Sequence, residues 1–308
     1  MTIIAMFFTI VKCQTASYRD RVGIREGDVM TRGLRRQSGR RFAIVLLGAL
    51  VLLPWREDAA MAQDLSPEVV RAIAPTGTLR AAINYGNIVL AQKGPGGEPA
   101  GVSADLAREL GRRLHVPVAF TTFETAGKVV EALDGLKTWD MAFLAIDPHR
   151  GQTIAFTPPY VIIEGAYMVA AGSPLTRNDE VDRPGVRIAV GRNTAYDLYL
   201  SRELKAAERV FAPTSQAALD LFRQDRLDAV ASVRQPLEAY ARDHADVRIL
   251  PGRFMVIEQA IALPKGRPEA EAYLRRFIEE MKASGFIANA LDRSNQRDAA
   301  VAPRATVP

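Results

Sequence analysis

The sequence predicts an α/β fold arranged as two lobes. Apolar strand patterns alternate with helical patterns from Thr78 onward, a polar stretch interrupts them between Gly172 and Pro184, and the alternation then resumes. Alternation of this kind is typical of mostly parallel sheets flanked by helices. The chain has 308 residues, about two domains' worth, and its 48% apolar content is ordinary for a globular protein.

The first lobe is expected over residues 76–171 and 259–293. Strands are predicted at 78–83, 116–121, 141–145 and 166–171, with a return strand at 259–263. Ser103 is expected to cap the first helix, because Leu106, Leu110 and Leu114 then fall four apart on one face. The glycine-rich segment 86–101 is expected to be a loop that can approach a ligand closely.

The second lobe is expected over residues 175–252, and the chain crosses back near 252–258. Its strands are predicted at 186–190, 209–211, 228–232 and 247–250. Helices are predicted after Thr194, over a segment that Ser215 is expected to cap, and over 235–243. A long amphipathic helix over 268–284 is stopped by Gly285. Residues 294–308, rich in Ala, Pro and Arg, are expected to be a disordered tail. Two crossings imply a hinge with a cleft between the lobes.

The amino-terminal region reads as a leader. Arginines 35, 36, 40 and 41 precede the apolar run 42–53, and Ala60-Met-Ala62 offers a cleavage site, so residues 30–62 are predicted to be a signal peptide. The run is shorter than the roughly 20 residues of a membrane span, which favours a signal over a retained anchor. Residues 1–29 are a doubtful upstream segment, and a start at Met30 is the preferred interpretation.

The charge of the chain also belongs to this leader. Residues 1–62 carry 10 Lys/Arg and 5 Asp/Glu, whereas the remaining residues carry 30 of each. The remainder is therefore neutral, which gives no support to nucleic-acid binding. The single cysteine, Cys13, lies upstream of the predicted signal, so the mature chain is expected to form no disulfides.

Arg150 is the strongest candidate for a binding residue. It follows the apolar run Met141–Ala145, so it is placed just beyond the carboxyl end of a buried strand. Ligands of open α/β sheets bind at that edge. Arginine is suited to a carboxylate because its planar fork offers two parallel donors. A solvated surface arginine is the alternative.

The segment from Arg150 to Tyr160, with Ile154, Phe156 and Thr157-Pro-Pro-Tyr160, resembles the signature of the family-3 periplasmic solute-binding proteins. Gly101 to Ala107, Ala189 to Thr194 and Leu227 to Val230 resemble further motifs of that family, in register over roughly 77–291. The resemblance implies a two-lobed periplasmic-binding-protein fold of type II, a small-molecule ligand and an ABC transporter permease as partner.

The turn before the first helix of the second lobe is a second candidate. Thr194 followed three residues later by Asp197 marks a helix amino terminus, where free N–H groups attract anions. A plain cap is the alternative. In the family this turn meets the ligand carboxylate from the second lobe, which implicates Asn193 and Thr194.

The sequence departs from the family at the partner for a ligand ammonium group. The usual carboxylate, five residues after the Asp of the Asp-Ala-Val strand, is replaced by Val233, and Arg234 follows. Asp147, Glu164 or Glu258 could substitute, although each also fits a surface or capping role. If Arg234 faces the cleft, it adds a second cation and favours an acidic ligand without an amino group.

Tyr85, just after the first strand, is a candidate for an aromatic wall of the cleft, with a core or rim position as the alternative. The three histidines lie far apart and show no metal spacing, so no metal or cofactor is expected.

The predicted function is an extracytoplasmic, periplasmic and monomeric binding protein of an ABC importer, taking an amino acid or a related small carboxylate. One alternative is an enzyme on the same scaffold, similar to cyclohexadienyl dehydratase, for which a cleft glutamate with a raised pKa would be diagnostic. The other is a sensory binding module.

Overall fold

One mixed β-sheet runs through both lobes of the computed structural model, which describes residues 65–136 and 138–305. Its strand order is β4-β1-β5-β12-β7-β10-β8-β9. The predicted upstream segment and signal peptide lie outside the described residues. In the part that is described, no helix combines the length and apolarity that a membrane span requires.

The first lobe contains the predicted strand-helix-strand-helix-strand unit. Strands β1 (Leu79–Asn84), β4 (Val118–Phe123) and β5 (Met141–Ala145) are parallel, with β1 in the centre. Helices α3 (Val102–Leu114) and α4 (Ala126–Leu136) connect them. The carboxyl ends of these strands therefore meet at one edge of the sheet.

The second lobe repeats this pattern. Strands β8 (Arg187–Gly191), β9 (Glu208–Ala212) and β10 (Ala229–Val233) are parallel, with β8 in the centre. Helices α5 (Ala195–Glu203), α6 (Ser215–Gln224) and α7 (Arg234–Asp243) follow successive strands of this lobe.

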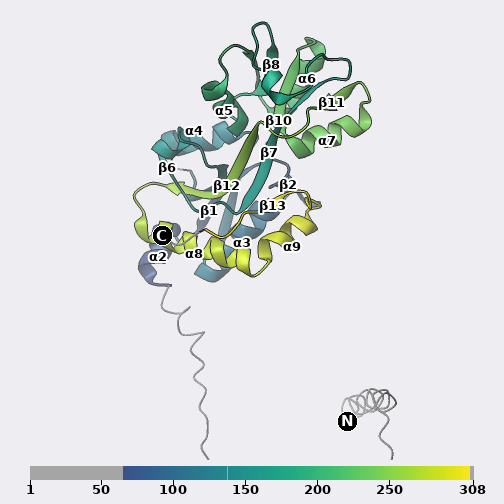
Figure 1. The fold of residues 1–308 in the computed structure, drawn as a ribbon. Coiled ribbons are helices and arrows are strands. Elements are labelled where there is room, and N and C mark those ends of the chain that lie inside the picture. The colour runs from purple at the N-terminus through teal and green to yellow at the C-terminus, as the bar shows by residue number, and fades with distance from the viewer. Residues whose placement is uncertain (1–64, 137, 306–308) are drawn as a thin grey trace, which may run out of the picture. The chain divides into compact units, whose positions relative to one another are not determined.

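Two long antiparallel strands join the lobes, β7 (Val161–Ala170) and β12 (Met255–Pro264). Figure 1 shows them side by side between the α3, α8 and α9 region and the β8, α6 and α7 region. The first half of β7 pairs with β12, and its second half pairs with β10 and β11 (Val247–Ile249). The first crossing therefore lies inside β7, earlier than the sequence predicts.

The remaining elements complete the lobes: α2 (Pro67–Ile73), β2 (Gln92–Lys93), β3 (Pro99–Ala100), the 3₁₀ turns η1 (Arg150–Gln152) and η2 (Asn178–Glu180), β6 (Ile154–Phe156), α8 (Pro268–Ala283), α9 (Phe286–Arg293) and β13 (Ala300–Val301). Strand β13 pairs with Val161 and Ile162 of β7. The segment predicted to be a disordered tail thus contributes a strand beside the crossing.

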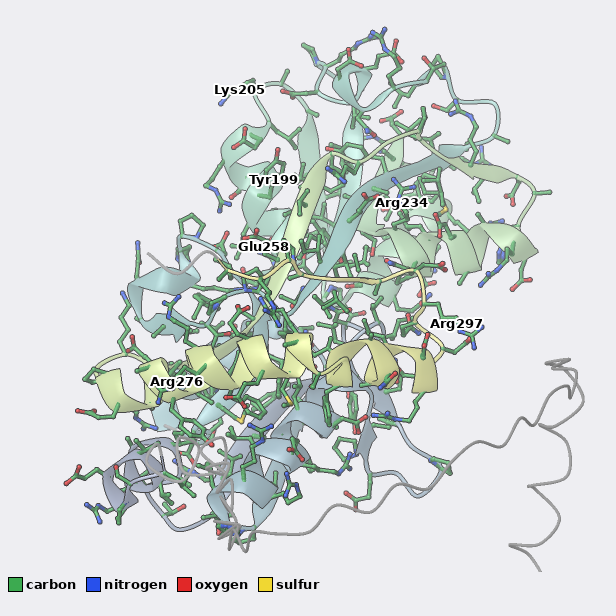
Figure 2. All side chains as sticks on the ribbon, turned by 60° about the horizontal axis from the view of Figure 1, so that its bottom comes forward. Tyr199, Lys205, Arg234, Glu258, Arg276 and Arg297 are labelled. Carbon is green, nitrogen blue, oxygen red and sulfur yellow. The ribbon has the colours of Figure 1, made fainter. Side chains whose placement is uncertain are left out.

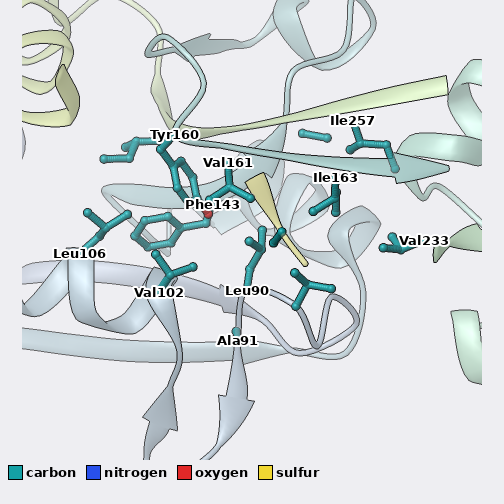
Figure 3. Packing of buried hydrophobic residues seen from close by; sticks show 14 of the residues in the cluster. Leu90, Ala91, Val102, Leu106, Phe143, Tyr160, Val161, Ile163, Val233 and Ile257 are labelled. Carbon is teal, nitrogen blue, oxygen red and sulfur yellow. The ribbon is translucent and has the colours of Figure 1, made fainter. Parts of the chain in front are cut away.

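The core of the first lobe lies between α3 and the sheet. Leu106 and Val102 pack near Phe143 and Tyr160, whose rings meet edge to face at 6.0 Å (Figure 3). The Tyr160 hydroxyl lies 3.2 Å from Ser103 Oγ in this core. Ser103 is therefore an interior residue of α3, and Gly101, with φ of 95°, stands at the cap position instead.

Candidate functional site

A cavity of about 40 Å³ lies between the lobes. The first lobe contributes the ends of β1 and β5 and the start of α4, and the second contributes the amino termini of α5 and α6. Its polar lining residues are Asn84, Asn87, Glu124, Thr125, Arg150, Thr194, Ser215 and Gln259. The cavity therefore brings together strand ends that were predicted from the sequence.

Arg150 supplies the positive charge of this cavity. Its side chain is buried, with a relative exposure of 2%. Its Nη1 donates to the Ala145 carbonyl at 3.2 Å, and its Nη2 donates across the cleft to the Asn193 carbonyl at 3.0 Å. Burial lowers the pKa of Arg150 to about 10, while the nearby charge of Asp147 raises it. The guanidinium is therefore still charged at neutral pH.

Local sequence explains how Arg150 is held. Asp147 follows β5, and its Oδ1 accepts hydrogen bonds from the backbone N–H groups of His149 and Arg150, which fixes the turn η1. Within the described chain Arg150 forms no ion pair. A buried cation whose hydrogen-bond acceptors are neutral carbonyls is suited to an anionic ligand.

The amino terminus of α5 faces the same cavity. Thr194 caps the helix as predicted, because its Oγ1 accepts from the backbone N–H of Asp197 at 3.2 Å. Thr194, Ala195 and Tyr196 line the cavity, whereas Asn193 meets Arg150 through its carbonyl and is not a lining residue. The helix end places its positive dipole near Arg150, so both groups favour an anion.

Tyr85 lines a second cavity, of about 180 Å³, that adjoins the first. The two cavities share five lining residues, Gly86, Asn87, Glu124, Ser215 and Val233. The Tyr85 hydroxyl and Asn87 Oδ1 are buried, and neither has a hydrogen-bond partner among the residues that the structure describes. Burial raises the pKa of Tyr85, and the charges of Glu98 and Glu124 raise it further.

The carboxylates considered as ammonium partners are engaged elsewhere or point away. Asp147 Oδ2 forms an ion pair with Arg202 Nη1 at 2.9 Å. Glu164 accepts from Arg234 at 2.8 Å and from Arg253 at 2.7 Å, and these arginines lower its pKa. Glu258 is exposed on β12 (Figure 2).

Arg234 lies at the start of α7 (Figure 2). It is not among the residues that line the cavity. Besides Glu164, it contacts Glu238 and the Gly252 carbonyl. It therefore ties α7 to both crossing segments of the hinge and is not placed as a second cation of the site.

Several lining residues are not apparent from the sequence. Asn84 and the pair Glu124-Thr125 stand at the carboxyl ends of β1 and β4, where strand-end logic could have found them. Gln259 is buried within β12, and no sequence pattern distinguishes it from the rest of that strand. Glu124, which was not among the predicted acidic partners, lines both cavities.

A metal site does not emerge from this geometry. Among the described residues there is no group of three His, Cys, Asp or Glu side chains placed to hold an ion. The cavity instead combines one guanidinium, one exposed carboxylate and several neutral hydrogen-bonding side chains. Such a set can bind and orient a small organic anion.

Solved structures share this fold. A mutant of ArgBP from T. maritima matches with a TM-score of 0.63 and 21% identity, over 74% of this chain and 99% of that one. The cysteine-binding protein of Campylobacter jejuni matches with a TM-score of 0.63 and 19% identity, over 73% and 92%. The ancestral amino acid-binding protein AncCDT-1, a precursor of cyclohexadienyl dehydratase, matches with a TM-score of 0.61 and 22% identity, over 73% and 97%.

These similarities confirm the predicted type II periplasmic-binding-protein fold. The comparison with curated protein sequences found no match. Residues 79–295 match the sequence profile of the bacterial extracellular solute-binding proteins, family 3. The chain therefore belongs to family 3 of the bacterial extracellular solute-binding proteins.

Proposed function

We propose that this protein is the binding subunit of an ABC importer and takes a small organic acid, or an amino acid, into the cleft between its lobes. The observation that carries the proposal is Arg150, a buried and charged guanidinium that lines the cavity and has only neutral acceptors. A ligand carboxylate would supply the missing negative charge. The α5 amino terminus would meet the same carboxylate from the opposite lobe.

The similar structures support solute binding rather than catalysis. ArgBP and the cysteine-binding protein are named for what they bind, and AncCDT-1 is named as an amino acid-binding precursor of an enzyme. The alternative function, an enzyme similar to cyclohexadienyl dehydratase, would require a glutamate in the cleft with a raised pKa. The pKa values of Glu109, Glu164 and Glu180 are lowered, and none of these residues lines the cavity. The enzyme alternative gains no support from this.

Export through the predicted signal peptide is part of the proposal. Proteins of family 3 are extracytoplasmic, and the leader has a basic region, a run of about a dozen apolar residues and a small-residue site. Expression from Met30 in a Gram-negative host should yield a periplasmic protein whose first residue lies near Gln63. Amino-terminal sequencing of the periplasmic fraction checks this. Recovery of an uncleaved chain with the membranes would favour a retained anchor.

A ligand screen with an Arg150 variant tests the binding function. Thermal shift against amino acids and small organic acids should identify a stabilising compound, and calorimetry should then give its affinity. We expect Arg150→Ala to weaken binding by about 3–5 kcal/mol, because it leaves a desolvated ligand carboxylate unpaired. Arg150→Lys should restore only part of this, since an ammonium lacks the planar fork.

The matched control is Arg177→Ala, which removes an arginine from an exposed ion pair with Asp179 on the second lobe. Its affinity for the same compound should equal that of the parent protein. Equal affinities of Arg150→Ala and the parent would remove Arg150 from the site.

A further inference from the structure

Three contacts join the lobes beside the cavity in the described chain. Asp147 of the first lobe pairs with Arg202 of α5, the Arg150 guanidinium donates to the Asn193 carbonyl, and Gly127 of α4 lies against the Asn193 side chain. All three connect the edge of the first lobe, either the turn after β5 or the start of α4, with α5 or the turn before it. Each contact is made between protein atoms.

Asp147 carries two interactions at once. Its Oδ1 accepts from the backbone N–H groups of His149 at 2.9 Å and Arg150 at 3.4 Å. Its Oδ2 lies 2.9 Å from Arg202 Nη1. The same carboxylate therefore fixes the turn that presents Arg150 and binds the opposite lobe.

The burial of the pair is unequal. The Asp147 side chain is 4% exposed, whereas that of Arg202 is 40% exposed. The stability of a charged carboxylate buried to this degree depends on its hydrogen-bond and ion-pair donors far more than that of a surface carboxylate does. Two of its donors belong to its own turn, and the charged one comes from the other lobe.

An ion pair between lobes contributes only to the state in which the lobes are close. When the lobes separate, Arg202 moves away and Asp147 is hydrated again. An interaction present in one state and absent in the other shifts the equilibrium by its own free energy. This shift operates whether or not a ligand occupies the cavity.

We propose that Arg202 and Asp147 form an interlobe latch that populates the closed arrangement before a ligand binds and steadies the turn carrying Arg150. Arg202 is a positioning residue, because it acts on Arg150 through Asp147. The purpose assigned to this latch rests on the proposed function of the cavity. The contacts themselves are independent of any ligand. An ion pair half open to solvent is screened by salt, so the closed population should fall as ionic strength rises.

A distance measurement on the ligand-free, full-length protein tests the latch. Spin labels are attached at Glu131→Cys on α4 and Asp220→Cys on α6, both exposed, in a Cys13→Ser background that removes the single native cysteine. Pulsed electron paramagnetic resonance then gives the distribution of distances between the lobes. The parent should show a short-distance population, and Arg202→Gln should lower the ratio of short to long distances about fivefold.

Two further variants separate charge from packing. Arg202→Lys keeps the cation and should retain most of the short-distance population, whereas Arg177→Gln removes an arginine whose ion pair lies within the second lobe and should change nothing.

Raising the salt concentration from about 0.05 to 0.5 M should reduce the short-distance population in the parent and leave that of Arg202→Gln unaffected. Superimposable distributions for the parent and Arg202→Gln would overturn the proposal.

Hydrogen exchange provides the readout for the Arg150 turn. The amides of His149 and Arg150 should exchange several-fold faster in Arg202→Gln than in the parent or in Arg177→Gln, because Asp147 loses the partner that orients it. Unchanged exchange at both amides would refute the positioning role. Failure of the acid screen would count against the proposed ligand and leave these ligand-free measurements valid.

Discussion

The proposed class of ligand depends mainly on one residue, Arg150. Burial removes water from its guanidinium and lowers its pKa to about 10, yet it stays protonated at neutral pH. The carbonyls of Ala145 and Asn193 satisfy part of its hydrogen-bonding capacity without neutralising its charge. An uncharged ligand would leave the guanidinium without a direct ion-pair partner, with only the nearby charge of Asp147, so a carboxylate is favoured.

A ligand amino group would need an anionic partner in the cavity. Val233 lines both cavities at the position where the family has a carboxylate. Asp147 and Glu164 are held by arginines, and Glu258 does not line the cavity. Glu124 lines the cavity but is exposed, so it is a weak partner for an ammonium that must leave water.

We therefore expect deaminated acids to bind more tightly than the corresponding α-amino acids. Calorimetry on several matched pairs, such as an α-amino acid and the same acid without its amino group, measures this directly. Burial of an ammonium without a close anion costs several kcal/mol, so the preference should exceed about tenfold. Tighter binding of the amino forms would contradict the expectation. If the amino forms bind more tightly to the parent protein but not to Glu124→Gln, Glu124 would be identified as the partner of the ammonium group.

At the scale of elements, the sequence predicts the parallel units well because each strand and helix there has its own periodic pattern. Strand β5 lies at the predicted 141–145, and Thr194 caps α5 as expected. The predicted caps Ser103 and Ser215 are wrong, because a residue just before each of them occupies the cap position. Gly101 supplies a positive φ ahead of Ser103, and the Thr214 hydroxyl accepts from Ala217 N–H ahead of Ser215.

The crossing elements could not be predicted as well, because their pairing is long-range. The start of β7 follows Thr157-Pro-Pro-Tyr160, which reads as a turn, so the strand is visible in the sequence only from Ala166. The segment around β13 has a composition typical of disorder, yet Ala299 and Ala302 are buried and β13 pairs with β7. Tertiary contacts override composition at both places.

The same limit applies to the site. Arg150 and the α5 amino terminus follow from strand-end and capping rules, which are local. The pairing of Asp147 with Arg202 and the inward orientation of Gln259 depend on how the lobes meet. No local pattern in one chain specifies that arrangement.

For the whole molecule, the proposed binding in the cleft requires the two lobes to approach each other closely. Gly127 is a point of close approach between the lobes: a Cβ placed there would lie 2.7 Å from Asn193 Cβ in the opposite lobe. Real Cβ atoms do not approach other atoms this closely, and both backbones would have to move. The closed arrangement therefore requires a glycine at this position of α4.

Gly127→Ala should consequently weaken binding of an acid found in the screen while leaving the lobes folded. Overpacking costs about 1–3 kcal/mol, which corresponds to about a 5- to 150-fold loss of affinity. In the ligand-free protein, alanine should be tolerated in α4, because this glycine does not have a positive φ and alanine favours helix by up to about 1 kcal/mol. Affinity and thermal stability should thus change in opposite directions, or affinity alone should fall.

Gly96→Ala is the matched control, since a Cβ at Gly96 meets no atom within 4 Å and its substitution leaves the cleft untouched. Calorimetry and thermal unfolding of both variants separate closure from folding. A parallel loss of stability and affinity in Gly127→Ala would indicate damage to α4 itself. Unchanged affinity would show that the lobes bind the acid without approaching as closely as they do in this structure, because only the close approach brings Asn193 against residue 127.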